Sequence, residues 1–361
     1  MANCSQGPQT DATRAAAEQY LESWNRGGMD WDAWMEEVHR AKGVFAALIG
    51  ASPDNIAVFS SVSEATSAVA SALDFSGRKR RVVVSEMEFP TIGHVWLAQE
   101  RRGAQVSWVA IHDGVIEPTD YDAVLDDDTA LVAACHGYYL NGFTQDLSLI
   151  VERAHATGAL VFADAYQTLG AWPISVQETG VDFLASGNLK YLMGVPGIAF
   201  LYVRPGLAET LQPSITGWFG RANPFAFAAK VLDWSAGASR FDTGTPPIPN
   251  AYIARAGMEI IAGIGVEKIR AWHYVLAQRL REGGRERGLT QHGPADSTRK
   301  TANSAFLVND AHAIEREMRG RGVLPSARGP VIRLAPHFYN TIDDVDAALD
   351  LLAELTRAHR S

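Results

Sequence analysis

Long apolar runs are missing from this sequence. Its 361 residues include no uninterrupted apolar stretch approaching about 20 residues, the length that a helix needs to cross a bilayer. The first residues, MANCSQGPQTDATR, lack the charged start and apolar run of a secretory signal. We therefore expect no membrane partner.

Cysteine is also scarce. The two cysteines, Cys4 and Cys135, lie far apart and match no metal-ligand spacing. Isolated thiols of this kind are typical of a reducing compartment. The sequence therefore predicts a cytoplasmic protein without a metal site.

Positive charge is in deficit. Lys and Arg number 32 against 41 Asp and Glu, which gives a formal net charge of −9. Because no basic excess offsets phosphates, nucleic acid is not an expected partner. A local basic pocket for a small anion is still compatible with this charge balance. The hydrophobic share of 47% is ordinary for a globular protein, and the length suffices for a large domain and a smaller one.

Seven short apolar runs alternate with helical patterns in the first 203 residues. This alternation predicts an α/β fold with a mostly parallel seven-stranded sheet and helices on both faces. In such sheets ligands bind beyond the carboxyl ends of the strands. The predicted strands cover residues 55–60, 81–86, 105–111, 130–137, 159–165, 181–186 and 198–203.

The pattern changes on either side of this region. Residues 11–49 and 250–287 have helical periodicity, and a Pro- and Gly-rich irregular connection precedes the second stretch. A smaller α+β unit ends the chain. We predict an N-terminal segment (1–30) packed on the small domain, a large cofactor-binding domain (31–249) and a small α+β domain (250–361).

Lys190 is the strongest chemical signal. It and Asp182 are the only charged residues in the segment DFLASGNLKYLMGVPGIAFLYV, which spans residues 182–203. A lysine usually lies in solvent, but burial of an ammonium group costs several kcal/mol and lowers its pKa. A lowered pKa is what an amine needs to form a Schiff base.

Asp164 lies at the end of the predicted strand 159–165, and Gln167 follows three residues later. Asp164 could cap a helix or bind a metal, but it precedes Lys190 by 26 positions (190 − 164), which leaves room for one helix and one strand. Pyridoxal 5′-phosphate (PLP) catalysis needs both a lysine for C4′ and an acid for the ring nitrogen. Gln167 could then hydrogen-bond the ring oxygen.

The stretch SVSEATSAV (61–69) opens a helix directly after a predicted strand. Its first N–H groups, together with the hydroxyls of Ser61 and Ser63, suit a phosphate dianion. A simple capping box is the alternative interpretation.

These stretches resemble the class V aminotransferase superfamily of fold-type I PLP enzymes, which includes kynureninase, cysteine desulfurases, isopenicillin N epimerase-like enzymes and C–S lyases. DAYQTLGAWPI and VDFLASGNLKYLMGVPGIAFLYV carry the resemblance, which extends over almost the whole chain. It implies PLP as the cofactor and Lys190 as its Schiff-base lysine. It further implies cofactor contacts from Asp164 (ring nitrogen), Gln167 (O3′), the turn Ser63, Glu64 and Ala65 (phosphate), Phe89 (ring stacking) and Asn188.

Two further motifs, GWFG (217–220) and RFDTGTPP (240–247), look most like kynureninase. The resemblance implies that Trp218 contributes to the cofactor site and that Thr245 reaches the phosphate of a neighbouring subunit, hence a homodimer. Arg333 resembles the arginine that clamps the substrate α-carboxylate, a task suited to a guanidinium fork. Arg328 is its nearest competitor, and Asn3 and Asn141 are further substrate-binding candidates.

Two departures from the family narrow the activity. No cysteine follows Cys135, so a persulfide-forming desulfurase is not expected, and Leu189 stands where kynureninase usually has Tyr. We predict an enzyme that acts on an amino acid through an external aldimine, with side-chain cleavage (a C–S or C–C lyase) favoured. The alternatives are a class V aminotransferase, an epimerase or decarboxylase, a non-catalytic scaffold, and a hydrolase that uses Cys135 and His136, whose side chains point to opposite faces of a strand.

Overall fold

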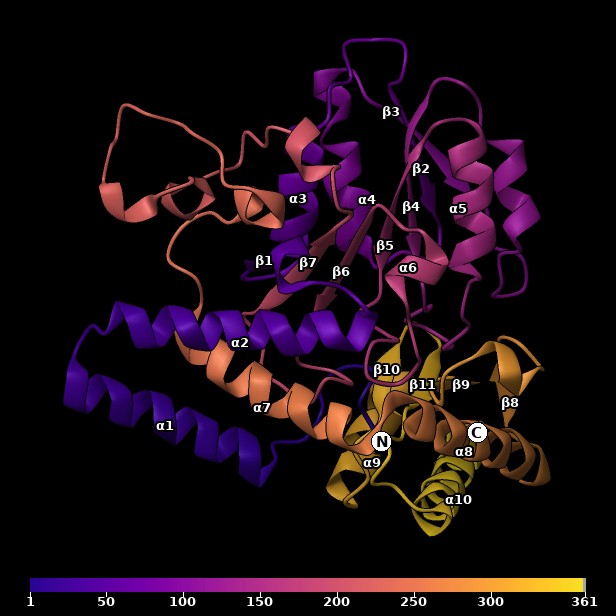
Figure 1. Cartoon of the computed structure of the whole chain (residues 1–361). Coiled ribbons are helices and arrows are strands. Elements are labelled where there is room, and N and C mark those ends of the chain that lie inside the picture. The colour runs from indigo at the N-terminus through magenta and orange to yellow at the C-terminus, as the bar shows by residue number, and fades with distance from the viewer. Residues whose placement is uncertain (360–361) are drawn as a thin grey trace.

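A seven-stranded sheet forms the centre of the large domain in the computed structural model, which describes residues 1–359 (Figure 1). Its order is β1-β7-β6-β5-β4-β2-β3. β7 runs antiparallel to both of its neighbours, whereas the other pairs are parallel, so the predicted mostly parallel sheet is confirmed. The strands are β1 Ile56–Phe59, β2 Arg81–Ser85, β3 Gln105–Val109, β4 Thr129–Cys135, β5 Leu160–Asp164, β6 Phe183–Gly187 and β7 Ala199–Val203.

Helices cover both faces of this sheet because both faces of its strands are apolar. In β1, Ile56 and Val58 join one hydrophobic cluster and Ala57 and Phe59 join the other, as the alternation of side chains along a strand requires. On one face lie α3 (Val62–Ala72) and α4 (Pro90–Leu97); on the other lie α2 (Trp31–Ile49), α5 (Leu147–Ala156) and α7 (Ile248–Ile264). The short α6 covers Val176–Thr179.

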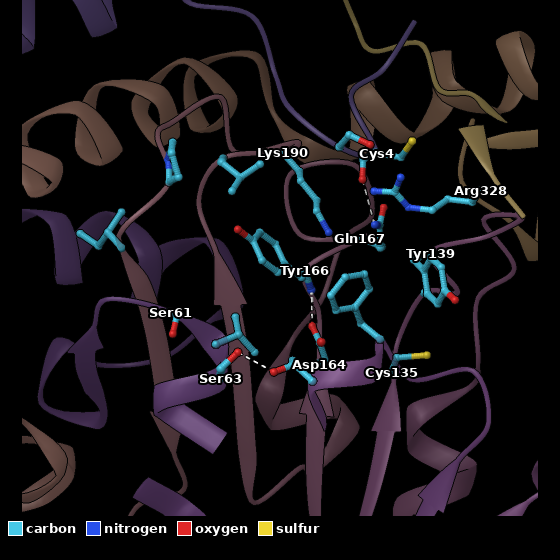
Figure 2. Close-up of a pocket in the computed structure, with 18 of the residues that line it drawn as sticks. Cys4, Ser61, Ser63, Cys135, Tyr139, Asp164, Tyr166, Gln167, Lys190 and Arg328 are labelled. Carbon is cyan, nitrogen blue, oxygen red and sulfur yellow. Dashed lines mark hydrogen bonds between the residues drawn. The ribbon is translucent and has the colours of Figure 1, made fainter. Parts of the chain in front are cut away.

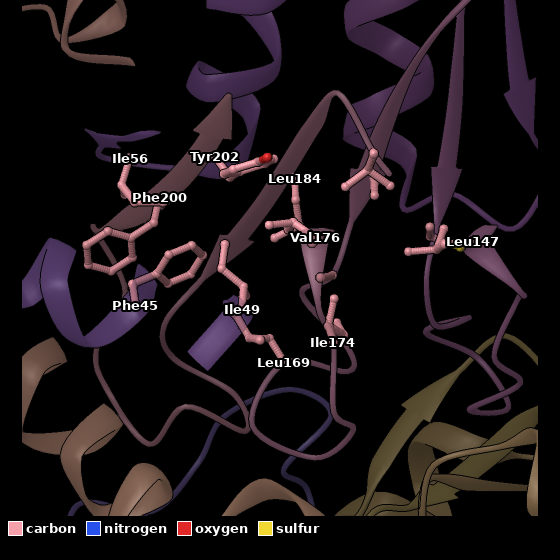
Figure 3. Packing of buried hydrophobic residues seen from close by; sticks show 14 of the residues in the cluster. Phe45, Ile49, Ile56, Leu147, Leu169, Ile174, Val176, Leu184, Phe200 and Tyr202 are labelled. Carbon is pink, nitrogen blue, oxygen red and sulfur yellow. The ribbon is translucent and has the colours of Figure 1, made fainter. Parts of the chain in front are cut away.

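The cluster that contains Ile56 and Val58 also includes a stacked pair of aromatic rings. Phe45 of α2 stacks on Phe200 of β7 with ring centroids 4.7 Å apart, and Ile49 lies beside them (Figure 3). This contact fixes α2 against the antiparallel edge of the sheet.

Two predicted helical stretches are each interrupted by glycine. The stretch 11–49 divides into α1 (Asp11–Gly27) and α2, with Gly28 at φ +61° between them. The stretch 250–287 divides at Gly265, where φ is +93°, into α7 and α8 (Val266–Glu286). The prediction of a continuous helix was wrong at both places, because a positive φ, which glycine adopts readily, ends the helical hydrogen-bond ladder.

The C-terminal part forms the predicted smaller α+β domain. Its four-stranded antiparallel sheet has the order β10-β11-β9-β8 and packs against α8, α9 and α10. The division at residue 249 stays a prediction, since α7 packs in the core of the large sheet and α1 packs on α7. The elements are β8 Thr290–His292, β9 Ser304–Leu307, α9 Ala311–Gly320, β10 Ser326–Arg328, β11 Val331–Leu334 and α10 Ile342–Ala358.

The first seven residues connect the two domains. Asn3 N–H donates to the carbonyl of Ala335 just after β11, and Gly7 N–H donates to the carbonyl of Leu189 in the large domain. The N-terminal segment therefore lies along the junction between the two domains. Within residues 1–359 no helix is both long and apolar enough to span a bilayer.

Candidate active site

A cavity of about 490 Å³ lies beyond the carboxyl ends of β4, β5 and β6, where the two domains meet (Figure 2). β4 ends at Cys135, β5 ends at Asp164, and the loop after β6 carries Lys190. Parallel strands bring their carboxyl ends to one edge, so residues far apart in sequence meet here. Six of the predicted site residues line the cavity: Ser63, Phe89, Asp164, Gln167, Lys190 and Arg333.

The Lys190 amine lies among aromatic rings. Its Nζ is 4.1 Å from the centroid of the Tyr166 ring and 5.7 Å from that of Phe89. Part of the side chain is accessible from the cavity, but desolvation of the amine lowers its pKa to about 8. Asp164 opposes this shift, whereas Arg333 and Arg328 add to it.

Asp164 and Gln167 face the cavity from the end of β5. The Tyr166 N–H donates to Asp164 Oδ1 at 2.8 Å, and burial raises the pKa of the Asp164 carboxyl. Gln167 Nε2 donates to the Cys4 carbonyl at 3.0 Å, while its Oε1 is buried without a hydrogen-bond partner. A cationic group beside Asp164 and a donor beside Gln167 Oε1 would therefore be stabilised here.

Hydroxyl groups gather at the start of α3. Ser63 Oγ and Thr91 Oγ1 are 2.6 Å apart, and Ser61 Oγ accepts the N–H of Glu64 at 3.2 Å. Because Ser61 takes up the N–H groups of Glu64 and Ala65, those of Val62 and Ser63 remain without a partner among the described residues. Free N–H groups at a helix start favour an anion.

Sequence comparison identifies the family. The Aminotransferase class-V model matches residues 8–347. The chain is also 38% identical over 357 residues to the uncharacterized aminotransferase YcbU of Bacillus subtilis (strain 168), which covers 99% of this chain and 94% of that protein. The chain belongs to the aminotransferase class-V family. It is thus an enzyme of the PLP-dependent fold type I.

Another relative and two solved structures are named for different activities. Kynureninase of Pseudomonas fluorescens is 26% identical over 347 residues, which cover 93% of this chain and 81% of that protein. Apo cysteine desulfurase from Thermococcus onnurineus NA1 has the same fold, with a TM-score of 0.89 at 21% identity and coverage of 99% and 94%. The cystine C–S lyase C-DES, solved with its product cysteine persulfide, gives a TM-score of 0.89 at 17% identity and coverage of 98% and 96%.

The cavity fits the PLP cofactor of the class-V family. The amine with a lowered pKa matches the aldehyde of PLP, and the buried carboxyl without a cation matches its pyridine nitrogen. The unpartnered amide oxygen matches the ring hydroxyl, and the free N–H groups at a helix start match the phosphate. The residues that would hold these four groups are Lys190, Asp164, Gln167 and the Ser63 turn.

Several other predicted cofactor residues do not line this cavity in their own chain. Glu64 and Ala65 lie behind Ser63 within α3, and Asn188 is fully buried with neither side-chain polar atom partnered. Trp218 packs against Trp31, with ring centroids 5.5 Å apart, in a separate aromatic group. Thr245 also lies outside the cavity, so its role toward a second subunit stays a prediction.

The two predicted substrate-binding asparagines are engaged within the protein. Asn3 Nδ2 donates to the Ala335 carbonyl at 2.9 Å, and its Oδ1 accepts the Tyr339 hydroxyl. Asn141 Nδ2 donates to the Gly114 carbonyl at 2.8 Å, and its Oδ1 accepts the N–H of Phe143. Both side chains hold backbone segments in place and lie outside the cavity lining.

The cavity also contains residues that the sequence motifs did not reveal. Cys4, Tyr139 and Tyr166 line it, although the sequence analysis assigned none of them a role; Tyr166 lies within the stretch DAYQTLGAWPI. Beside it lies Glu88, whose carboxyl pKa is raised well above its usual range by burial and by the charge of Asp164. The sequence gives no signal for Glu88, because a glutamate is usually exposed and its burial beside Asp164 depends on tertiary packing.

Cys135 and His136 face different cavities. Cys135 lines the cavity that holds Lys190, whereas His136 lines a second one and contacts Thr168 through Nδ1 at 2.9 Å. This separation agrees with the expected opposite orientation along β4, so Cys135 and His136 do not form a nucleophile–base pair.

Proposed function

We propose that this class-V enzyme cleaves the side chain of an amino-acid substrate. The main observation in support is the cavity, which is lined by Lys190, Asp164, Arg333 and Tyr139. When bound, PLP supplies an electron sink for negative charge at the substrate α-carbon. The side chains of the cavity orient the substrate and carry the protons.

Lys190 is the proton carrier in this proposal. Its Nζ takes the proton from the substrate α-carbon, and a pKa near 8 keeps part of the amine in the basic form close to neutral pH. Asp164 holds a proton at the ring nitrogen, and Arg333 orients the α-carboxylate. Tyr139, whose ring meets Phe89 edge to face with centroids 5.3 Å apart, supplies a proton to the departing fragment.

Transamination is the second candidate, because the relative at 38% identity is named an aminotransferase. The two reactions differ in their need for a keto acid. Holoenzyme is incubated with single amino acids, and pyruvate, alanine, ammonia and amino-group transfer are measured separately, with Lys190→Ala as the control. Release of pyruvate or alanine without a keto acid supports side-chain cleavage, whereas strict dependence on a keto acid refutes it.

We further propose that the protein forms a homodimer. The irregular segment between β7 and α7 projects from the large domain (Figure 1) and exposes apolar side chains, among them Phe227 at 75%. Exposed apolar surface of this kind favours an interface. In the dimer Thr245 would serve the neighbour's site, and the molecular mass in solution tests the assembly. Cytoplasmic location remains a prediction.

A further inference from the structure

Two arginines reach the cavity from one face of the small sheet. β10 and β11 pair antiparallel, with Ser326 opposite Arg333 and Arg328 opposite Val331. Directly opposed residues share a face, as do residues two apart in one strand. Ser326, Arg328 and Arg333 therefore lie on the same face, and both arginines line the cavity.

The two guanidinium groups differ in how many donors are in use. Arg333 is 1% exposed and donates to the Tyr139 carbonyl at 2.7 Å and to Ser326 Oγ at 2.6 Å. It also donates to Ser5 Oγ at 3.0 Å and to the Ser326 carbonyl at 3.4 Å. Arg328 makes a single contact, to the Ala327 carbonyl at 2.9 Å. Since a guanidinium has five N–H donors, most of those of Arg328 remain free.

Neither arginine has a counter-ion. Within residues 1–359 no carboxylate lies at ion-pair distance from Arg328, Arg333 or Lys190, in a chain with 41 acidic residues. Figure 2 shows the Arg328 side chain on one side of Lys190 and Ser61 and Ser63 on the other. Arg328 is exposed and lies on the far side of Lys190 from the phosphate-type donors at the start of α3, so its charge is available to a molecule in the cavity.

We propose that Arg328 binds a second acidic group, so that the preferred substrate is a dicarboxylic amino acid. This inference rests on the proposed function: Arg333, held rigidly by its four contacts, takes the α-carboxylate, and Arg328 takes the side-chain carboxylate. A carboxylate accepts two N–H groups of a guanidinium fork, which its uncharged amide counterpart does not match.

The test compares acids with their isosteric amides. Holoenzyme is titrated with L-aspartate and L-asparagine, and with L-glutamate and L-glutamine, while the change in the cofactor band near about 420 nm is followed. The wild type is expected to bind the acid about 10- to 100-fold more tightly than the amide, the range for a charge-assisted hydrogen bond.

Variants then assign the preference to one arginine. Arg328→Gln should bring the acid-to-amide ratio close to one, and Arg328→Lys should restore part of it. Arg333→Gln should weaken all four ligands while the ratio persists. Arg316→Gln, an exposed arginine on α9, is the matched control and should behave as the wild type.

Three results would overturn the inference in distinguishable ways. Equal binding of acid and amide to the wild type refutes the dicarboxylic substrate but leaves the proposed function standing. A parallel loss for acid and amide in Arg328→Gln means that both arginines share the α-carboxylate. A protein without any cofactor band, or with a band that no amino acid changes, defeats the proposed function and this inference together.

Discussion

Replacement of Lys300 by methionine should stabilise the protein at neutral pH. Lys300 precedes β9 and is 1% exposed; its Nζ contacts Ser304 Oγ at 2.6 Å. Burial, with smaller contributions from Arg281 and Arg270, lowers its pKa from 10.5 to about 7. Below pH 7 the chain must therefore bury a cation that the unfolded state would solvate.

The magnitude follows from the two pKa values. A group with a folded pKa below its unfolded pKa destabilises the fold, fully below pH 7 and progressively less as pH rises toward 10.5. At pH 7 the cost is about 4 kcal/mol and at pH 9 about 2 kcal/mol. Methionine removes this cost but also a hydrogen bond worth about 1 kcal/mol, which leaves a gain of about 3 kcal/mol at pH 7.

Thermal and urea unfolding of wild type and Lys300→Met at pH 7, 8 and 9 measure this gain. The difference in unfolding free energy should shrink as pH rises, because only the wild type gains stability from deprotonation of this amine. Lys268→Met, at an exposed position of α8, is the control and should show little change. If Lys300→Met is less stable than the wild type at pH 7, or if its gain in unfolding free energy does not vary with pH, the proposed cost of burying the Lys300 ammonium is refuted.

Two further substitutions probe the cavity itself. In Gly187→Ala the new Cβ would lie 2.1 Å from Tyr166 Cζ, so Tyr166 must shift, and we expect a loss of about 1–3 kcal/mol together with weaker cofactor binding. Gly263→Ala, with open space around it in α7, is the control, and an unchanged cofactor affinity in Gly187→Ala would contradict the placement of Tyr166. Asp164→Asn removes a buried carboxyl whose pKa is raised, so the apo protein should become more stable near pH 7, while turnover falls about 100-fold or more because the amide cannot hold the ring-nitrogen proton. Lower apo stability with near-normal turnover would mean that Asp164 is only structural.

The sequence predicts the sheet well because each strand is a short apolar run with polar boundaries. All seven predicted strands are present, and Asp164 and Lys190 meet because each follows a strand whose carboxyl end reaches the same edge. Gly28 and Gly265 are present in the sequence, but the apolar periodicity continues across both of them. The pattern therefore did not predict that a helix ends at each glycine and that the next helix takes a new direction.

The rest of the cavity depends on tertiary packing that no local pattern records. Gln167 donates a hydrogen bond to the carbonyl of Cys4, which is 163 positions away in the sequence, and Arg333 donates one to the carbonyl of Tyr139, which is 194 positions away. Which side chains close the cavity is decided by how the small domain and the N-terminal segment rest on the large sheet. The family resemblance indicated Arg333, but nothing in the sequence showed that its guanidinium makes four hydrogen bonds within the protein whereas that of Arg328 makes one.

The attachment of the cofactor to Lys190 is the claim on which the account depends, and one labelling experiment tests it directly. Holoenzyme is reduced with borohydride, digested and mapped by mass spectrometry. One covalent adduct is expected, on the peptide that contains Lys190, and none in Lys190→Ala. An adduct on the buried Lys300, or no adduct at all, would contradict attachment at Lys190.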